Sequence, residues 1–168
     1  MLSEAIGLTL FPATMAFAAA SDLLTMTIAN RVSLLLVAGF VLAAALGGIS
    51  GAALALHIGA GGVVLAAGFL CFARGWIGGG DAKLAAATAL WLGFGQLFDY
   101  LIYTSLLGGA LTLAIIIFRL MPLPPRVASW QWAERLHQPN AGIPYGMALA
   151  AAALIVYPQS EWMARLAG

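Results

Sequence analysis

Two aspartates occupy apolar surroundings in which carboxylates are costly. Asp22 follows the run "FPATMAFAAAS", and Asp81 follows three glycines and precedes a second apolar run. Carboxylates at the edge of a membrane span are expensive to bury and usually have a function. Two of them at one depth can share a proton and activate water against a carbonyl carbon. The sequence therefore predicts Asp22 and Asp81 as a catalytic acid–base pair.

The composition predicts that these residues belong to an integral membrane protein. Of the 168 residues, 63% are hydrophobic and only 8% are charged, and the mean hydropathy is +1.01. Soluble domains carry about 25% charged residues, so the lipid bilayer is the expected partner. The net charge of +1 argues against nucleic acid as a partner.

Six apolar segments are candidates for membrane-spanning helices, each near the ~17–25 residues that a bilayer requires. Their apolar residues run continuously and do not alternate, which favours helices over a β-barrel. We therefore expect an all-α polytopic protein that forms one domain, residues 1–168. The predicted spans are residues 5–20, 32–46, 52–73, 82–94, 101–118 and 142–157.

The basic residues indicate how these spans are oriented. Six of the seven fall on one side of the predicted topology, namely Arg31, Arg74, Lys83, Arg119, Arg126 and Arg135. The positive-inside rule makes that side cytoplasmic and turns both termini outward. Asp22 then follows one crossing and Asp81 follows three, so both reach the cytoplasmic boundary. Residues 47–50 and the region of Asp99 are expected to be outward turns.

Residues near the two aspartates have several possible roles. Gly78, Gly79 and Gly80 can adopt positive φ and admit a substrate backbone, although a flexible turn alone would also explain them. Asn30 is a candidate cap for the second helix. Lys83 is equally compatible with binding a lipid phosphate or holding the pair's geometry, and with serving only as an orientation anchor.

The remaining polar residues favour structural roles. Cys71 is the only cysteine, and His57 and His137 lack a metal-ligand spacing, so no metal or cofactor is expected. We expect His57 to form an inter-helix hydrogen bond rather than a proton relay. The long connection, residues 120–141, is expected to be cytoplasmic. It includes a possible amphipathic helix over 127–138, and we favour a solvated linker over substrate recognition.

Three motifs resemble the membrane aspartyl proteases that carry a Gly-x-Gly-Asp signature. The segment "GGGDAKL", residues 78–84, is similar to that signature in its prepilin peptidase branch. The segment "SDLLTMTIANR" resembles the first motif of the branch, with Ala29 where the branch has proline. The segment "NAGIPYGMALAAAAL" is similar to the last-helix motif, through Pro144, Tyr145 and Gly146.

This resemblance implies an aspartic endopeptidase of the small CpaA/TadV type, with Asp22 and Asp81 as catalytic residues. The implied substrate is the leader of a Flp-type, type IV prepilin, cut at the cytoplasmic face of the plasma (inner) membrane. Larger relatives carry a cysteine-rich insertion and N-methylate the product. The absence of the cysteine-rich insertion here predicts a peptidase that does not N-methylate its product. A preflagellin-type peptidase and a non-enzymatic transporter or assembly subunit are the alternatives, and the oligomeric state stays open.

Overall fold

The computed structural model describes residues 6–167, which form helices and their connections without any strand. The all-α class is therefore confirmed. In chain order the elements are η1 (Ile6–Leu10), α2 (Phe11–Thr25), α3 (Asn30–Gly47), α4 (Gly51–Ala73), α5 (Gly79–Leu120), α6 (Pro125–Ala128), α7 (Gln131–His137), α8 (Tyr145–Val156), η2 (Tyr157–Gln159) and α9 (Glu161–Ala167).

Four helical stretches in the described part of the chain are long and apolar enough to cross a membrane. They are Ile6–Thr25, Asn30–Gly47, Gly51–Ala73 and Gly79–Leu120. The predicted first three spans correspond to the first three stretches, and the fourth and fifth spans both fall within α5. The sixth lies in α8, whose 12 residues fall short of the ~17–25 that a bilayer requires. The membrane class is supported, but the count of six is not confirmed.

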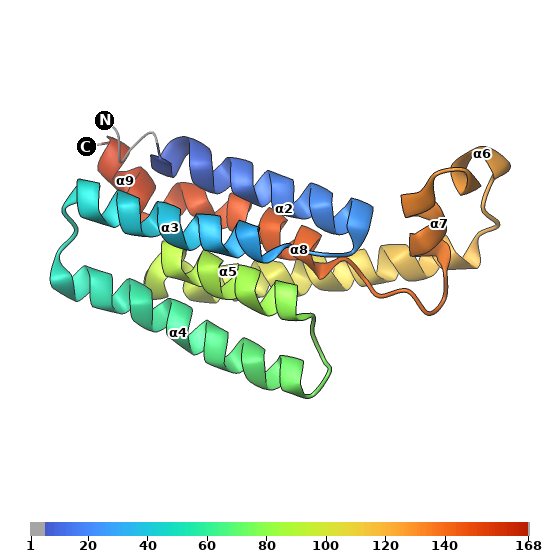
Figure 1. The fold of residues 1–168 in the computed structure, drawn as a ribbon, viewed down its shortest axis with the longest axis horizontal. Helices are drawn as coiled ribbons and strands as arrows, with labels where there is room; N and C mark the ends of the chain where they lie inside the picture. The colour runs from blue at the N-terminus through green and yellow to red at the C-terminus, as the bar shows by residue number, and fades with distance from the viewer. Residues whose placement is uncertain (1–5, 168) are drawn as a thin grey trace.

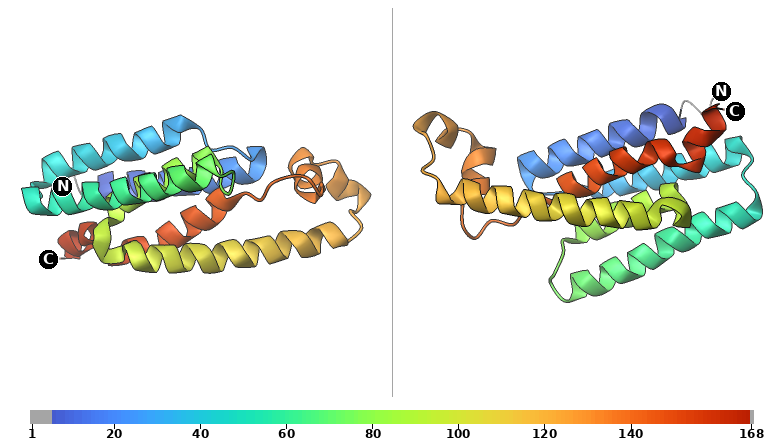
Figure 2. Two further views of the ribbon diagram at one scale, coloured as in Figure 1. Left: turned by 90° about the horizontal axis from the view of Figure 1, so that it is seen from below. Right: turned by 180° about the vertical axis from the view of Figure 1, so that it is seen from behind.

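The chain folds back inside α5, at Gly93 (Figures 1 and 2). This residue has φ 65° and ψ −175°, a backbone conformation that is essentially restricted to glycine. The turn predicted near Asp99 is wrong in position, because Asp99 lies within the helix that follows Gly93. The apolar pattern hid the turn, since the residues on both sides of Gly93 are apolar.

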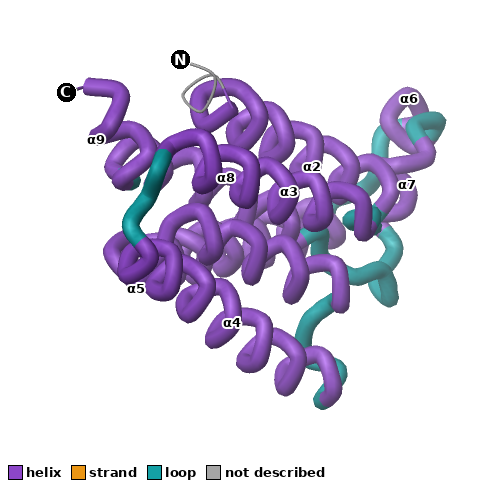
Figure 3. The backbone as a smooth tube through the Cα atoms, turned by 60° about the vertical axis from the view of Figure 1, so that its left-hand side comes forward, coloured by secondary structure: helices purple, strands orange, loops and turns teal. Residues whose placement is uncertain are grey.

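The helices form a bundle with two distinct ends (Figures 1 and 3). One end, here called the loop end, contains the last turn of α2, the first turns of α5 and α8, and the short helices α6 and α7. The other, here called the terminal end, contains η1, α9, the turn between α3 and α4, and the bend within α5. Asp22 and Asp81 both lie at the loop end.

An aromatic cluster holds the terminal end together. Trp91 is fully buried against Phe11, Phe40 and Trp162. Its indole N–H donates to the Leu36 carbonyl of α3 at 2.8 Å. This bond and the ring contacts connect the first part of α5 to α2, α3 and α9.

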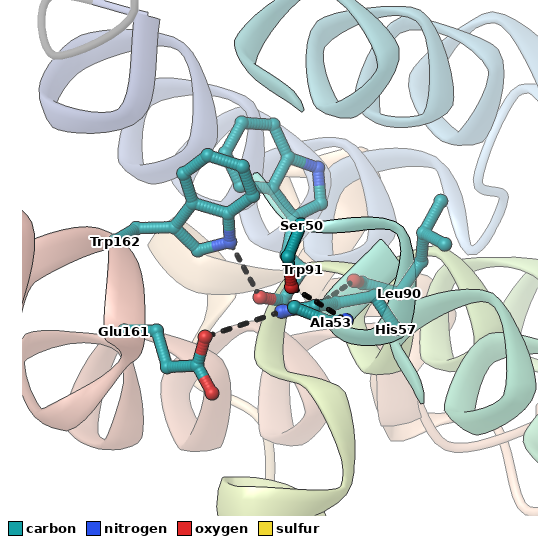
Figure 4. Close-up of polar contacts among 7 residues, drawn as sticks. All are labelled: Ser50, Ala53, His57, Leu90, Trp91, Glu161 and Trp162. Carbon is teal, nitrogen blue, oxygen red and sulfur yellow. Dashed lines mark hydrogen bonds and ion pairs between the residues drawn. The ribbon is translucent and has the colours of Figure 1, made fainter. Parts of the chain in front are cut away.

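Side chains also satisfy the carbonyls that the break at Gly93 leaves without helical partners. His57 Nδ1 hydrogen-bonds the Leu90 carbonyl at 2.8 Å, and Trp162 Nε1 donates to the Trp91 carbonyl at 2.9 Å (Figure 4). The inter-helix hydrogen bond expected for His57 is therefore present, and it stabilises the turn.

Candidate active site

Asp22 lies in the last turn of α2 and is only 5% exposed. The helix ends at Thr25, after which Met26 turns left-handed with φ 55°. The Oδ2 atom of Asp22 accepts a hydrogen bond from the backbone N–H of Gly146 at 2.7 Å, and Met147 offers a second N–H. Both N–H groups belong to the first turn of α8, where the helix dipole favours a negative charge.

Asp81 is the third residue of α5 and lies partly buried in its first turn. Its carboxylate faces the backbone N–H of Gly78, the N-cap residue, as the acidic residue of a capping box does. A Cβ atom on Gly78 would lie 2.9 Å from Asp81 Oδ2. Glycine at this position therefore leaves room for the carboxylate.

The role predicted for the three glycines is partly wrong. Gly78, Gly79 and Gly80 all have negative φ, and the last two lie inside α5. A Cβ atom on Gly80 would lie 3.1 Å from Cβ of Ile28. The close approach at Gly80 is therefore made by the protein's own α2–α3 loop, whereas Gly79 faces Phe72 of α4.

Ile28 is a site residue that the sequence did not reveal. A Cβ atom on Gly146 would lie 2.5 Å from Ile28 Cδ1 and 2.7 Å from Asp22 Oδ2. Ile28 therefore packs between the first turns of α5 and α8. An apolar residue in a short loop gave no signal of this contact, apart from its place in the motif that follows Asp22.

The two carboxyl groups lie close enough for the charge of Asp22 to act on Asp81. Within residues 6–164, no lysine or arginine forms an ion pair with either of them. Asp99 is exposed in the second part of α5 and does not join them. Two carboxyl groups in this relation can hold one proton between them, so that one acts as a base and the other as an acid.

Lys83 faces away from this pair. Its Nζ donates to Oδ1 of Asn30 at 2.8 Å, joining the first turn of α5 to the first turn of α3. The capping role predicted for Asn30 is wrong, because Ala29 is the N-cap and Asn30 is already helical. Asp81 and Lys83 point in roughly opposite directions, since two helical positions are separated by about 200°.

The third motif meets the first one in space. Pro144 is buried and precedes α8, and Gly146 provides the N–H that binds Asp22. The hydroxyl of Tyr145 shares a hydrogen bond with Thr112 Oγ1 of α5 at 3.1 Å. The segment therefore ties α8 to both α2 and α5.

Most residues of the connection 120–141 are exposed, as expected of a solvated linker, but hydrogen bonds also hold it against the loop end. Arg135 of α7 donates to the Leu24 carbonyl of α2 at 2.9 Å. Arg119 donates to the carbonyls of Leu136, Ala141 and Gly142. The sequence indicated these arginines only as orientation markers, because their carbonyl partners leave no trace in composition.

No three His, Cys, Asp or Glu side chains gather as a metal site within the part of the chain that the structure describes. The family model described as the type IV leader peptidase family matches residues 9–113, well over half of the chain. The chain belongs to the type IV leader peptidase family. Family members are aspartic peptidases that cleave prepilin leader peptides.

This peptidase therefore cleaves substrates of the prepilin type, and its apolar helices are those of a membrane protein. The matched region includes Asp22 and Asp81 and ends before α6, α7 and α8. No curated protein and no solved structure matches the chain.

Proposed function

We propose that Asp22 and Asp81 are the catalytic pair of this membrane aspartyl endopeptidase. One observation carries the proposal. Two carboxyl groups, 59 positions apart in the sequence, lie at one end of the bundle, close enough for one to act electrostatically on the other, and neither forms an ion pair with a basic residue among residues 6–164. Structural carboxylates in an apolar protein normally acquire a countercharge, and catalytic ones need a titratable proton instead.

The reaction follows from one shared proton. The ionised carboxylate takes a proton from water, and the water oxygen attacks the scissile carbonyl carbon. The protonated carboxyl group donates a hydrogen bond to the carbonyl oxygen and stabilises its developing negative charge. When the C–N bond breaks, a carboxyl proton passes to the leaving amine. The backbone N–H groups of α8 hold Asp22 in place during these steps.

The finer assignment rests on the sequence resemblance. We infer a substrate of the Flp-type prepilin class, cut at the cytoplasmic face of the plasma membrane by a multi-pass peptidase that occupies residues 1–168. The α2–α3 connection, residues 26–29, is too short to hold the cysteine-rich insertion of larger relatives. This supports cleavage without N-methylation of the product.

The test is cell-free cleavage of a co-expressed Flp-type prepilin, read by mass spectrometry of the pilin N-terminus. Asp22→Asn and Asp81→Asn should each lower the cleavage rate about 10³-fold, because each removes an acid–base group. The wild-type product should carry an unmodified N-terminus. Mass spectrometry reports both outcomes in one measurement.

Asp99→Asn is the matched control, because it makes the same chemical change at an exposed acid outside the pair. It should leave the cleavage rate unchanged. Continued processing by either Asn variant of the pair would refute the catalytic assignment. A methylated product would refute only the inference about N-methylation.

A further inference from the structure

An apolar groove lies between α3 and α4, above the first part of α5. Its first section is a cavity of about 540 Å³. Three polar residues line one end of it, namely Asn30, Ser33 and Lys83. The other lining residues are all apolar or glycine: Leu34, Val37, Ile58, Gly61, Gly62, Leu65, Ala86, Ala87 and Leu90.

The groove continues toward the terminal end. A second cavity of about 560 Å³ shares Val37, Ile58 and Leu90 with the first one and extends to Gly48. From Asn30 to Gly48 the helical rise is roughly 27 Å, close to the ~30 Å of a bilayer's hydrocarbon core. The polar end therefore lies at headgroup depth, and the apolar part lies at the depth of acyl chains.

The polar end carries a positive charge. Lys83 is exposed, and one of its three N–H groups donates to Asn30 Oδ1. The amide N–H₂ of Asn30 and the remaining Lys83 donors can still bind an anion. No acidic side chain is among the residues that line either described cavity.

We propose that this groove binds one anionic phospholipid, with its phosphate on Lys83 and Asn30 and an acyl chain along Gly62 and Ala87. A polar, cationic mouth above an apolar groove matches that molecule at both ends. A substrate peptide fits less well, because Lys83 and Asp81 point to opposite sides of α5. A peptide in the groove would therefore not reach the carboxyl pair.

The hydrogen bond between Lys83 and Asn30 also links the proposed lipid site to the candidate active site. The Lys83–Asn30 bond joins the first turn of α5 to the first turn of α3, which directly follows the loop that carries Ile28. Ile28 in turn packs against Gly80 and Gly146 beside the aspartates. A lipid that holds Lys83 and Asn30 would fix this loop, so cleavage should depend on anionic lipid. This consequence alone rests on the proposed function.

The direct test measures phospholipid retained by the full-length purified protein, using native mass spectrometry after incubation with phosphatidylglycerol. Lys83→Ala should lower retention about fivefold by removing the cationic anchor. Gly62→Leu should lower it by filling the groove, since a Cβ atom there has open space. Arg74→Ala and Gly51→Leu are matched controls outside the groove, and both should retain lipid like wild type.

A second readout compares cleavage in nanodiscs of phosphatidylcholine alone with nanodiscs of equal parts phosphatidylcholine and phosphatidylglycerol. Wild-type cleavage should be faster in the nanodiscs that contain phosphatidylglycerol. Lys83→Ala should cleave at the same rate in both kinds of nanodisc. Equal retention by wild type and both groove variants would overturn the proposal. So would a prepilin peptide that displaces the lipid, because the groove would then be a substrate site. Lipid retention requires no peptidase activity, so its failure is distinguishable from failure of the catalytic assignment.

Discussion

The two ends of the bundle bury polar groups in different ways. At the terminal end, His57 Nδ1 and the indole nitrogens of Trp91 and Trp162 each meet a backbone carbonyl at 2.8–2.9 Å. At the loop end, Asp22 and Asp81 face a few backbone N–H groups and act electrostatically on each other, and neither forms an ion pair with a basic side chain among residues 6–164.

This difference distinguishes polar groups that are buried to stabilise the fold from polar groups that are buried for a function. A buried polar group that bonds a neutral partner contributes to stability, whereas acids that are buried or partly buried without a countercharge cost stability. We therefore expect the terminal end to stabilise the fold and the loop end to carry the proposed catalytic residues. Substitutions at the loop end should change activity, and those at the terminal end should change stability.

Among the variants that leave both aspartates in place, Gly146→Ala should give the largest effect, on activity. A Cβ atom at this position would lie 2.7 Å from Asp22 Oδ2 and 2.5 Å from Ile28, so the carboxylate must move. Displacing a reacting group by about 1 Å can cost 10²-fold in rate. We therefore expect prepilin cleavage to fall about 10²-fold, with little change in the melting temperature in detergent.

Gly142→Ala is the control for this variant, since a Cβ atom at Gly142 meets nothing within 4 Å. It should keep wild-type activity and stability. If Gly146→Ala cleaves at the wild-type rate, the contact between α8 and Asp22 does not matter for the chemistry.

Gly93→Ala should give the next largest effect, this time on stability. The backbone at Gly93 is one that other residues adopt at a cost of about 1–3 kcal/mol, and a Cβ atom there would lie 3.1 Å from His57. We expect the free energy of unfolding in detergent to fall by about 2 kcal/mol. Gly95→Ala, whose Cβ atom has open space, should leave it unchanged. If Gly93→Ala lowered the cleavage rate by more than its loss of stability explains, the assignment of stability to the terminal end and activity to the loop end would be wrong.

His57→Phe tests whether the terminal end depends on its hydrogen bonds. The variant keeps an aromatic ring but leaves the Leu90 carbonyl buried without its partner, which costs about 1–3 kcal/mol. Glu161→Gln separates this bond from the contact between Glu161 Oε2 and His57 Nε2 at 3.9 Å, which is an ion pair only when His57 is protonated. Because Glu161 is 61% exposed, its loss should cost less than about 0.5 kcal/mol. Thermal unfolding of both variants in detergent would measure the difference, and equal losses would assign the stability to the ion pair.

The sequence predicted the all-α class of the fold and the location of Asp22 and Asp81 at one end of the bundle, because both depend on hydropathy. Apolar runs indicate helices, and counting crossings brought Asp22 and Asp81 to one side. Contacts that depend on backbone shape leave no signal in hydropathy. The turn at Gly93 and the packing of Ile28 each depend on the backbone conformation of one or a few residues. The periodicity of apolar residues along the chain does not reveal such conformations. The role of Asn30 was missed for a similar reason. Helix α3 begins at Asn30 itself, so Asn30 does not cap the helix and its side chain instead accepts a hydrogen bond from Lys83.

Arg135→Gln should give the smallest effect and tests how far the loop end extends. Arg135 ties α7 to the Leu24 carbonyl, two residues after Asp22, but the bond is exposed. Exposed contacts of this kind contribute about 0.2–1 kcal/mol, so we expect cleavage to fall by no more than about fivefold. Arg126→Gln removes an exposed charge of the same connection on α6 and should cleave at the wild-type rate. A drop for Arg135→Gln as large as that for Gly146→Ala would instead make α7 part of the catalytic apparatus, because an exposed tether alone cannot account for 10²-fold.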